Sequence, residues 1–317
     1  MVKNFAQGWL AALVIGAATF LLYSINLERL PDGDELYHAL AAQGLLETGE
    51  PSIGEHGRYW RGYPTTWLVA HSYALFGPSL TAARLPSVLL MTALVVGLFV
   101  FMRRETSATA AWIGAGLFAV SPFALAVAQF ARFYSLQGLA FFIAAWLVYR
   151  QIGQPWPLWR HVAAAVPAAL LLAFAVYLQP TTLLGIAGLG LWAIGALLLP
   201  WLVDSTVPAR VKLYVVAGLL VTGLVAAMAA WALGLVDALW MRYRSTMLFN
   251  ELQGENFLFY HLWYMLYYPT LWTLSGILAV LALIDRPRLA GFALTIFVTG
   301  FLLNSFAAAK SLRYIFY

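Results

Sequence analysis

The sequence contains no cysteine, and only 10% of its 317 residues are charged. Without cysteine the chain has no disulfide bonds, thiolate zinc sites or cysteine nucleophiles. The basic residues form no run, so the net charge of +5 gives no reason to expect a nucleic-acid partner. Soluble domains are about a quarter charged, so a chain with so few charges is not expected to fold in water.

Hydrophobic residues are correspondingly abundant: they make up 63% of the chain, and the mean hydropathy is +0.81. They form runs of the length that crosses a bilayer as a helix, about 17 to 25 residues. We therefore expect an all-α polytopic membrane protein, with residues 1–317 forming a single module of nine or ten transmembrane helices. The nine runs are 8–27, 84–102, 108–128, 134–149, 162–178, 183–203, 213–236, 262–284 and 289–307, and a tenth helix would begin near Tyr314.

Two longer stretches separate these runs, residues 28–83 and residues 237–261. Basic residues are equally numerous on the two sides of the membrane, but on one side they lie in short loops with few acids. The positive-inside rule counts short loops, so that side is expected to be cytoplasmic. This places 28–83 and 237–261 outside an inner (plasma) membrane, as a first and a second outer loop.

Several arginines lie on the outer side, close to the ends of the runs. Such residues commonly reach the interface or pair with local acids. As a group they predict an anionic ligand, because guanidinium groups match the geometry of phosphate. The candidates are Arg58, Arg61, Arg132, Arg242, Arg244 and Arg313.

The first outer loop opens with three carboxylates, Asp32, Asp34 and Glu35. Asp32 and Glu35 have the spacing of a capping box, which predicts an amphipathic helix on the membrane surface that ends at Thr48-Gly49. Carboxylates are also favoured at a helix N-terminus by the helix dipole, and we assign Asp32 to that role. Asp34 is assigned to function instead.

Tyr37 and His38 follow Asp34 and could line a polar pocket with it, although a structural hydrogen bond is the commoner fate of each. His261 lies in a segment crowded with aromatic residues, which form either an interfacial belt or a sugar platform. The histidines of the chain are scattered and show no metal-ligand spacing.

The Asp34-Glu35-x-Tyr37 motif after the first hydrophobic run resembles the Asp-Glu motif of GT-C glycosyltransferases, above all the protein O-mannosyltransferases and the lipid A aminoarabinose transferases. Further similar motifs follow in the same order across the chain. They are Tyr63-Pro64 with Trp67, Phe76-Gly77-Pro78-Ser79, Ala83-Arg84-Leu85-Pro86-Ser87, Ala131-Arg132-Phe133-Tyr134-Ser135-Leu136, Phe259-Tyr260-His261-x-Trp263-Tyr264 and Lys310-Ser311-Leu312-Arg313-Tyr314.

The resemblance implies a GT-C-like bundle that transfers a sugar from a polyprenyl phosphate to a protein, lipid or glycan acceptor at the outer face, among membrane lipids. Asp34 would be the general base of an inverting displacement, and Glu35 would support it or touch the acceptor. No cofactor is expected, and a divalent cation at Asp34 and Glu35 is not favoured. The expected substrate-binding residues are Tyr37, His38, Arg58, Arg61, Arg132, Tyr134, Arg242, Arg244, His261 and Arg313.

The sequence departs from the family pattern in three places. Gln137 stands where relatives often carry an acid, which leaves Asp34 to act largely alone. Arg61 and the single Pro64 replace a lysine before paired prolines. The chain stops at Tyr317, earlier than its relatives, and is expected to be a short member or an incomplete sequence.

Two other classes of function fit a polytopic protein. A transporter or flippase for an anionic or lipid-linked substrate would keep ionisable residues at mid-membrane, whereas here the charges gather at one face. A non-catalytic scaffold subunit would use its loop charges for docking and would tolerate changes at Asp34.

Overall fold

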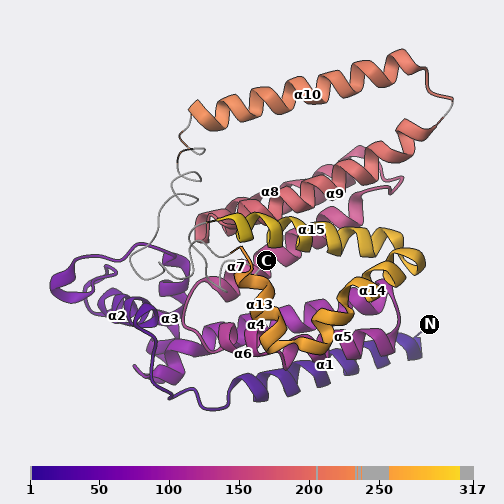
Figure 1. Ribbon diagram of the computed structural model, residues 1–317. Helices are drawn as coiled ribbons and strands as arrows, with labels where there is room; N and C mark the ends of the chain where they lie inside the picture. The colour runs from indigo at the N-terminus through magenta and orange to yellow at the C-terminus, as the bar shows by residue number, and fades with distance from the viewer. Residues whose placement is uncertain (1, 205, 233, 235–236, 238–256, 308–317) are drawn as a thin grey trace. The chain divides into compact units, whose positions relative to one another are not determined.

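The computed structural model describes residues 2–204, 206–232, 234, 237 and 257–307 (Figure 1). Within these residues the regular structure is helical, apart from one isolated bridge between Ser52 and Arg58. Each of the nine predicted runs falls on a helix or on a pair of helices that meet at a bend. The chain is a multi-pass helical membrane protein, as predicted.

The chain divides into two compact units, and the first consists of Met1–Val148 and Leu158–Thr182 together with the last two residues. It contains most of the outer-loop residues. Its helices are α1 (Val2–Tyr23), α2 (Gly33–Thr48), η1 (Gly54–His56), α3 (Tyr63–Phe76), α4 (Leu80–Glu105), α5 (Ala108–Ala119), α6 (Pro122–Ala128), most of α7 (Tyr134–Gln151) and α8 (Leu158–Leu178).

The second unit consists of Tyr149–Pro157 and Leu183–Ile315. Its helices are α9 (Thr182–Val203), α10 (Ala209–Ala232), α13 (Phe259–Tyr267), α14 (Pro269–Asp285) and α15 (Pro287–Phe306). In this unit Arg288 donates two hydrogen bonds of 2.7 Å to the carbonyl oxygens of Tyr149 and Ile152. These bonds connect the start of α15 to the end of α7.

Two predicted spans are bent. The run 108–128 is divided into α5 and α6 at an angle of 63°, and the run 262–284 into α13 and α14 at 109°. A proline at the first position of the second helix accounts for each break, because its ring cannot continue the helix before it: Pro122 in α6 and Pro269 in α14. Five described helices are long and apolar enough to cross a membrane, or up to seven if each bent pair is one span.

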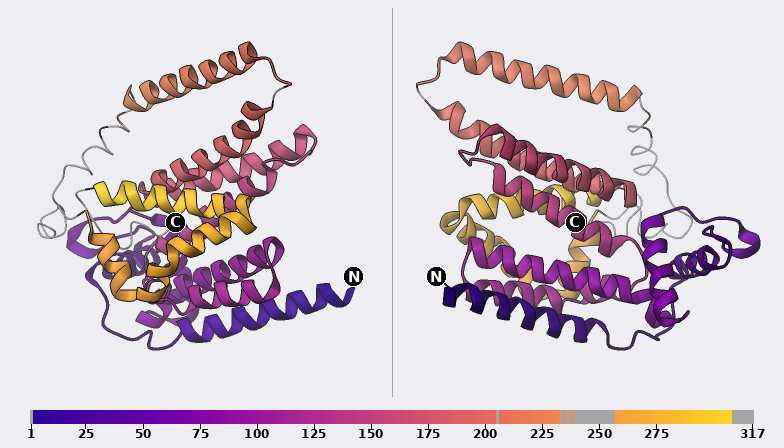
Figure 2. Two further views of the ribbon diagram at one scale, coloured as in Figure 1. Left: turned by 45° about the vertical axis from the view of Figure 1, so that its right-hand side comes forward. Right: turned by 180° about the vertical axis from the view of Figure 1, so that it is seen from behind.

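The core of the first unit lies between α1, α4, α5 and α6. Figures 1 and 2 show α1 and α4 side by side, with α2 and α3 at one end of them. α4 is the longest helix, with 26 residues, and begins four residues before the predicted span because Ser79 caps it. Its first turn therefore lies next to α3.

α2 confirms the helix predicted in the first outer loop. The Asp32 side chain caps it, Glu35 completes the capping box, and Gly49 ends it with φ of 78°. Gly44 lets the following loop pack closely, since a side chain there would come within 2.3 Å of the Ser52 carbonyl oxygen. These contacts fix the two ends of α2 and the loop that follows it.

Candidate active site

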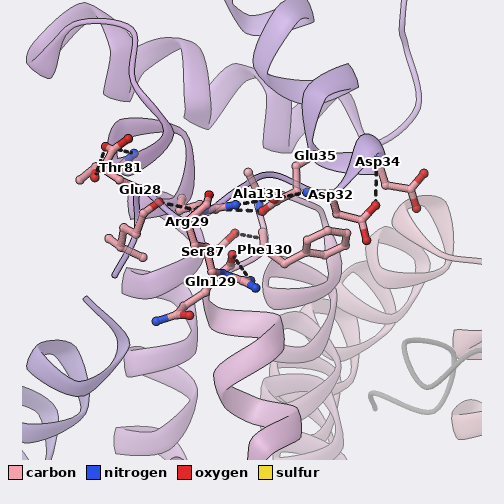
Figure 3. A network of polar contacts seen from close by, with 12 residues as sticks. Glu28, Arg29, Asp32, Asp34, Glu35, Thr81, Ser87, Gln129, Phe130 and Ala131 are labelled. Carbon is pink, nitrogen blue, oxygen red and sulfur yellow. Dashed lines mark hydrogen bonds and ion pairs between the residues drawn. The ribbon is translucent and has the colours of Figure 1, made fainter. Parts of the chain in front are cut away.

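The loop after α1 is held against the segment between α6 and α7 (Figure 3). The Gln129 side-chain amide donates to the carbonyl oxygens of Tyr23 and Ile25, and Arg29 donates to the Gln129 carbonyl oxygen. Glu28 accepts hydrogen bonds from the backbone and hydroxyl of Thr81, in the first turn of α4. These hydrogen bonds fix the position of the chain just before Asp32, where the acid-rich turn begins.

Glu35 lies buried at the centre of this network, with an exposure of 2%. Arg84 donates to both of its carboxylate oxygens, over 3.1 and 2.6 Å, and the backbone N–H groups of Ala131 and Asp32 donate over 2.9 and 3.0 Å. Arg84 is fully buried and also donates to the carbonyl oxygens of Leu27 and Arg29. Glu35 thus connects three segments of chain, and its contacts are those of a positioning residue.

Asp34 points away from Glu35 (Figure 3). Its side chain is 39% exposed, and it forms an ion pair with Arg132, whose side chain is 5% exposed. The Arg132 guanidinium also lies over the ring of Phe133, at 5.0 Å from the ring centre, and its Nε has no hydrogen-bond partner among the described residues. The pair therefore combines an accessible carboxylate with a buried cation that has donor capacity to spare.

His38 is fully buried one turn further along α2. Its Nδ1 lies 2.9 Å from the Thr66 hydroxyl, and the rings of Tyr59 and Phe133 pack against it edge to face. Its Nε2 has no partner within the described part of the chain. Burial lowers the pKa of His38 from 6.5 to about 3, with the positive charges of Arg132 and Arg61 acting in the same direction. The imidazole is therefore neutral at physiological pH.

This depressed pKa predicts that the protein loses stability in acid. Below pH 6.5 the unfolded chain binds a proton at His38 that the folded protein does not, so stability falls as the pH drops from 6.5 towards 3. At pH 5 the loss is about 2 kcal/mol. Thermal unfolding at pH 7 and pH 5 tests this, with His38→Asn as the control whose unfolding temperature should change less between the two pH values. An equal change in both proteins would contradict it.

Arg61 approaches Phe133 as well, with its Cζ 5.4 Å from the ring centre, and its Nη2 lies 3.4 Å from the Gln179 side-chain oxygen. The next residue, Gly62, has φ of 61°, and a side chain there would come within 2.5 Å of Phe133. Glycine therefore allows the loop to bring Arg61 against this ring. Arg61 and Arg132 together place two guanidinium groups around one aromatic side chain.

Gln137 is buried in the first turn of α7. Its amide nitrogen donates to the Thr182 hydroxyl over 2.9 Å, and its amide oxygen has no partner among the residues that the structure describes. The described residues contain no group of three or more metal-ligating side chains.

The other predicted site residues have different surroundings, and three of them lie outside the described chain. Arg58 pairs with Glu50 at the exposed bridge of the first loop, and Tyr37 stacks on Tyr59 with ring centres 5.3 Å apart. Tyr134 is buried, and the Arg132 guanidinium lies over its ring with Cζ 5.6 Å from the ring centre, so the structure does bring this residue to the Asp34–Arg132 pair. His261 belongs to the second unit, where it accepts a hydrogen bond of 2.9 Å from the Trp272 indole. Arg242, Arg244 and Arg313 lie outside the described residues.

No individual role is predicted from the sequence for four residues that build the site: Thr66, Arg84, Phe133 and Gln179. Arg84 has a detectable signal, since an arginine at the start of an apolar run that becomes buried is expected to pair with a carboxylate or with backbone carbonyl groups. Thr66 and Gln179 carry no such signal, because a neutral polar residue at a helix end is common.

The sequence matches no protein-family model and no curated protein. Two crystal structures of ArnT from Cupriavidus metallidurans are similar to this chain in fold. The structure bound to undecaprenyl phosphate has a TM-score of 0.67 and 18% identity, over 98% of this chain and 58% of the ArnT chain. The apo structure has a TM-score of 0.62 and 18% identity, over 98% and 57%. This chain therefore spans little more than half the length of ArnT, and the matches confirm its predicted GT-C-like helical membrane fold.

Proposed function

We propose that this protein is a membrane glycosyltransferase that takes its sugar from a polyprenyl-phosphate donor, with Asp34 as the general base. The observation that carries the proposal is the exposed Asp34 carboxylate beside the buried Arg132 guanidinium, with Arg61 across the same Phe133 ring. The fold shared with ArnT bound to undecaprenyl phosphate supports the class of donor. We place the reaction at the outer face of the membrane, where 28–83 is predicted to lie.

Two anions can bind the Arg132 guanidinium in this reaction, the Asp34 carboxylate and the phosphate of the donor. With the Asp34 carboxylate the guanidinium forms an ion pair. A phosphate offers more negative charge and more acceptor oxygens than a single carboxylate, so a donor phosphate at this position competes for the guanidinium. We infer that donor binding moves Arg132 from Asp34 to the phosphate and leaves the carboxylate available to accept a proton.

The proposed reaction is a single displacement that inverts the anomeric carbon. The acceptor oxygen attacks that carbon while Asp34 accepts the hydroxyl proton, and the bond to the phosphate oxygen breaks. The polyprenyl phosphate leaves as an anion, stabilised by Arg132 and Arg61. A phosphate leaves without needing a proton, so one carboxylate suffices where glycosidases use two. The guanidinium groups supply the positive charge, so no divalent cation is required.

His38 and Glu35 have supporting roles in this proposal. The neutral His38 imidazole is buried in the aromatic and arginine cluster, where it packs against Tyr59 and Phe133 and supports the ring on which Arg132 and Arg61 lie. Glu35 keeps the first turn of α2 in place through Arg84 and does not touch the substrate. In this proposal Asp34 alone accepts the proton of the acceptor hydroxyl, and Glu35 takes no part in the proton transfer.

Donor binding by Arg132 is tested with undecaprenyl phosphate and its uncharged analogue undecaprenol. We expect undecaprenyl phosphate to raise the unfolding temperature of the purified protein and undecaprenol to have little effect, since a ligand that binds only the folded state stabilises it. Arg132→Gln should weaken phosphate binding at least tenfold, because a charge-assisted hydrogen bond contributes about 1.5 to 3 kcal/mol. Arg160→Gln, at an exposed arginine of α8, is the matched control. Equal stabilisation by the two lipids would contradict the proposal.

A further inference from the structure

A cleft of about 190 Å³ lies between α1 and α4, at the end of α4 opposite α2 and α3. Arg103 in the cleft follows Arg84 by nineteen residues on the same helix. At a rise of about 1.5 Å per residue the two are roughly 28 Å apart, which is close to the thickness of the hydrocarbon core. The cleft therefore lies at the opposite membrane interface from the Asp34 site. It is lined by Gly8, Trp9, Ala12, Phe99, Val100, Arg103 and Arg104.

The walls of the cleft divide into an apolar part and a cationic part. Gly8 has no side chain, and a Cβ there would lie 3.4 to 3.6 Å from the Arg103 guanidinium, so this group lies along the surface of α1. The Arg104 guanidinium lies 5.6 Å from the centre of the Trp146 ring, and Trp9 is 60% exposed. None of the residues that line the cleft is acidic.

We propose that this cleft binds the phosphate headgroup of an anionic glycerophospholipid. Two guanidinium groups match the phosphate, and the apolar wall of Ala12, Phe99 and Val100 matches the first carbons of the acyl chains. Basic clefts between membrane helices at the interface bind lipid headgroups in this way. An exposed tryptophan such as Trp9 suits the same depth, because its amphipathic ring favours the headgroup region.

Membrane orientation and the dipole of α4 also favour arginines at this helix end. Neither effect accounts for the cleft itself, whose wall at Gly8 carries no side chain and lies against the Arg103 guanidinium. A free phosphate would have to lose water against the apolar wall without gaining apolar contacts there. A phospholipid places its phosphate against the arginines and its acyl chains against the apolar wall, so we propose it as the ligand of the cleft.

The experiment compares phosphatidylglycerol and phosphatidylcholine binding to the purified full chain by native mass spectrometry, together with their effect on thermal unfolding. We expect phosphatidylglycerol to bind at least tenfold more tightly, and Arg103→Gln with Arg104→Gln to remove that preference. Arg160→Gln is the matched control, since it deletes an exposed arginine that does not line the cleft. The control should keep the preference, and its loss there would show diffuse electrostatic attraction and overturn the site.

Gly8→Leu provides a second test if the double arginine variant does not fold. It removes no charge, but its side chain fills the cleft and meets the Arg103 guanidinium, so phosphatidylglycerol binding should fall to a similar degree. Unchanged binding by this variant would overturn the proposal. Inorganic phosphate at the same concentration should produce no stabilisation, and a phosphate effect equal to that of the lipid would identify a free-anion site instead. The test is independent of sugar transfer, because it measures lipid binding at the other end of α4.

Discussion

Asp34→Asn is expected to reduce sugar transfer by about a hundredfold or more, because a positioned general base contributes roughly 10² to 10⁴ to the rate. An asparagine amide cannot accept the acceptor proton, although it has the shape of the aspartate. The fold should change less than it does on Glu35→Gln, since the Asp34 side chain is 39% exposed and water reaches this ion pair. Release of polyprenyl phosphate from a radiolabelled polyprenyl-phosphate sugar, with a membrane extract as acceptor source, measures the effect.

The same variant also tests the exchange of partners at Arg132. With no carboxylate to compete for its guanidinium, Arg132 is available to the donor at all times, so Asp34→Asn should bind undecaprenyl phosphate as tightly as the wild type or more tightly. Arg132→Gln changes binding in the opposite direction. A protein that keeps most of its transfer activity after Asp34→Asn would remove the base from the mechanism. Weaker donor binding in Asp34→Asn would argue that Asp34 helps to hold the donor.

Local sequence patterns predicted the helices well, because the forces that form them act within a few residues. The Asp32–Glu35 capping box and Gly49 set both ends of α2. The apolar runs located the membrane helices for the same reason. The bends at Pro122 and Pro269 were missed because a run of suitable length was taken as one straight helix, although each proline indicated a break.

The candidate site was harder to predict, since it depends on contacts between residues far apart in the chain. Asp34 and Glu35 were grouped because they are neighbours, but successive helical residues point about 100° apart. One carboxylate therefore meets Arg132 at an open surface and the other meets Arg84 in the interior. Arg58 and Arg61 are both predicted to bind the substrate, yet Arg58 pairs with Glu50 at the exposed bridge.

Glu35→Gln should destabilise the fold, whereas Asp34→Asn should mainly reduce sugar transfer. The amide keeps the size of the side chain but leaves the Arg84 charge uncompensated in the interior. Removing one partner of a buried ion pair costs about 3 to 5 kcal/mol. We expect a large fall in unfolding temperature and in the yield of monodisperse protein in detergent. Asp34→Asn is the matched control, because it makes the same chemical change one residue earlier.

A double variant, Glu35→Gln with Arg84→Met, separates charge from packing. Replacing both members of a buried pair by groups of similar size is often neutral, so part of the lost stability should return. The recovery should be incomplete, because Arg84 also donates to the carbonyl oxygens of Leu27 and Arg29, and methionine leaves these acceptors unpaired. If Glu35→Gln unfolds at the wild-type temperature, the pair does not hold α2. If that variant instead keeps its fold but loses transfer as Asp34→Asn does, Glu35 acts in the reaction itself.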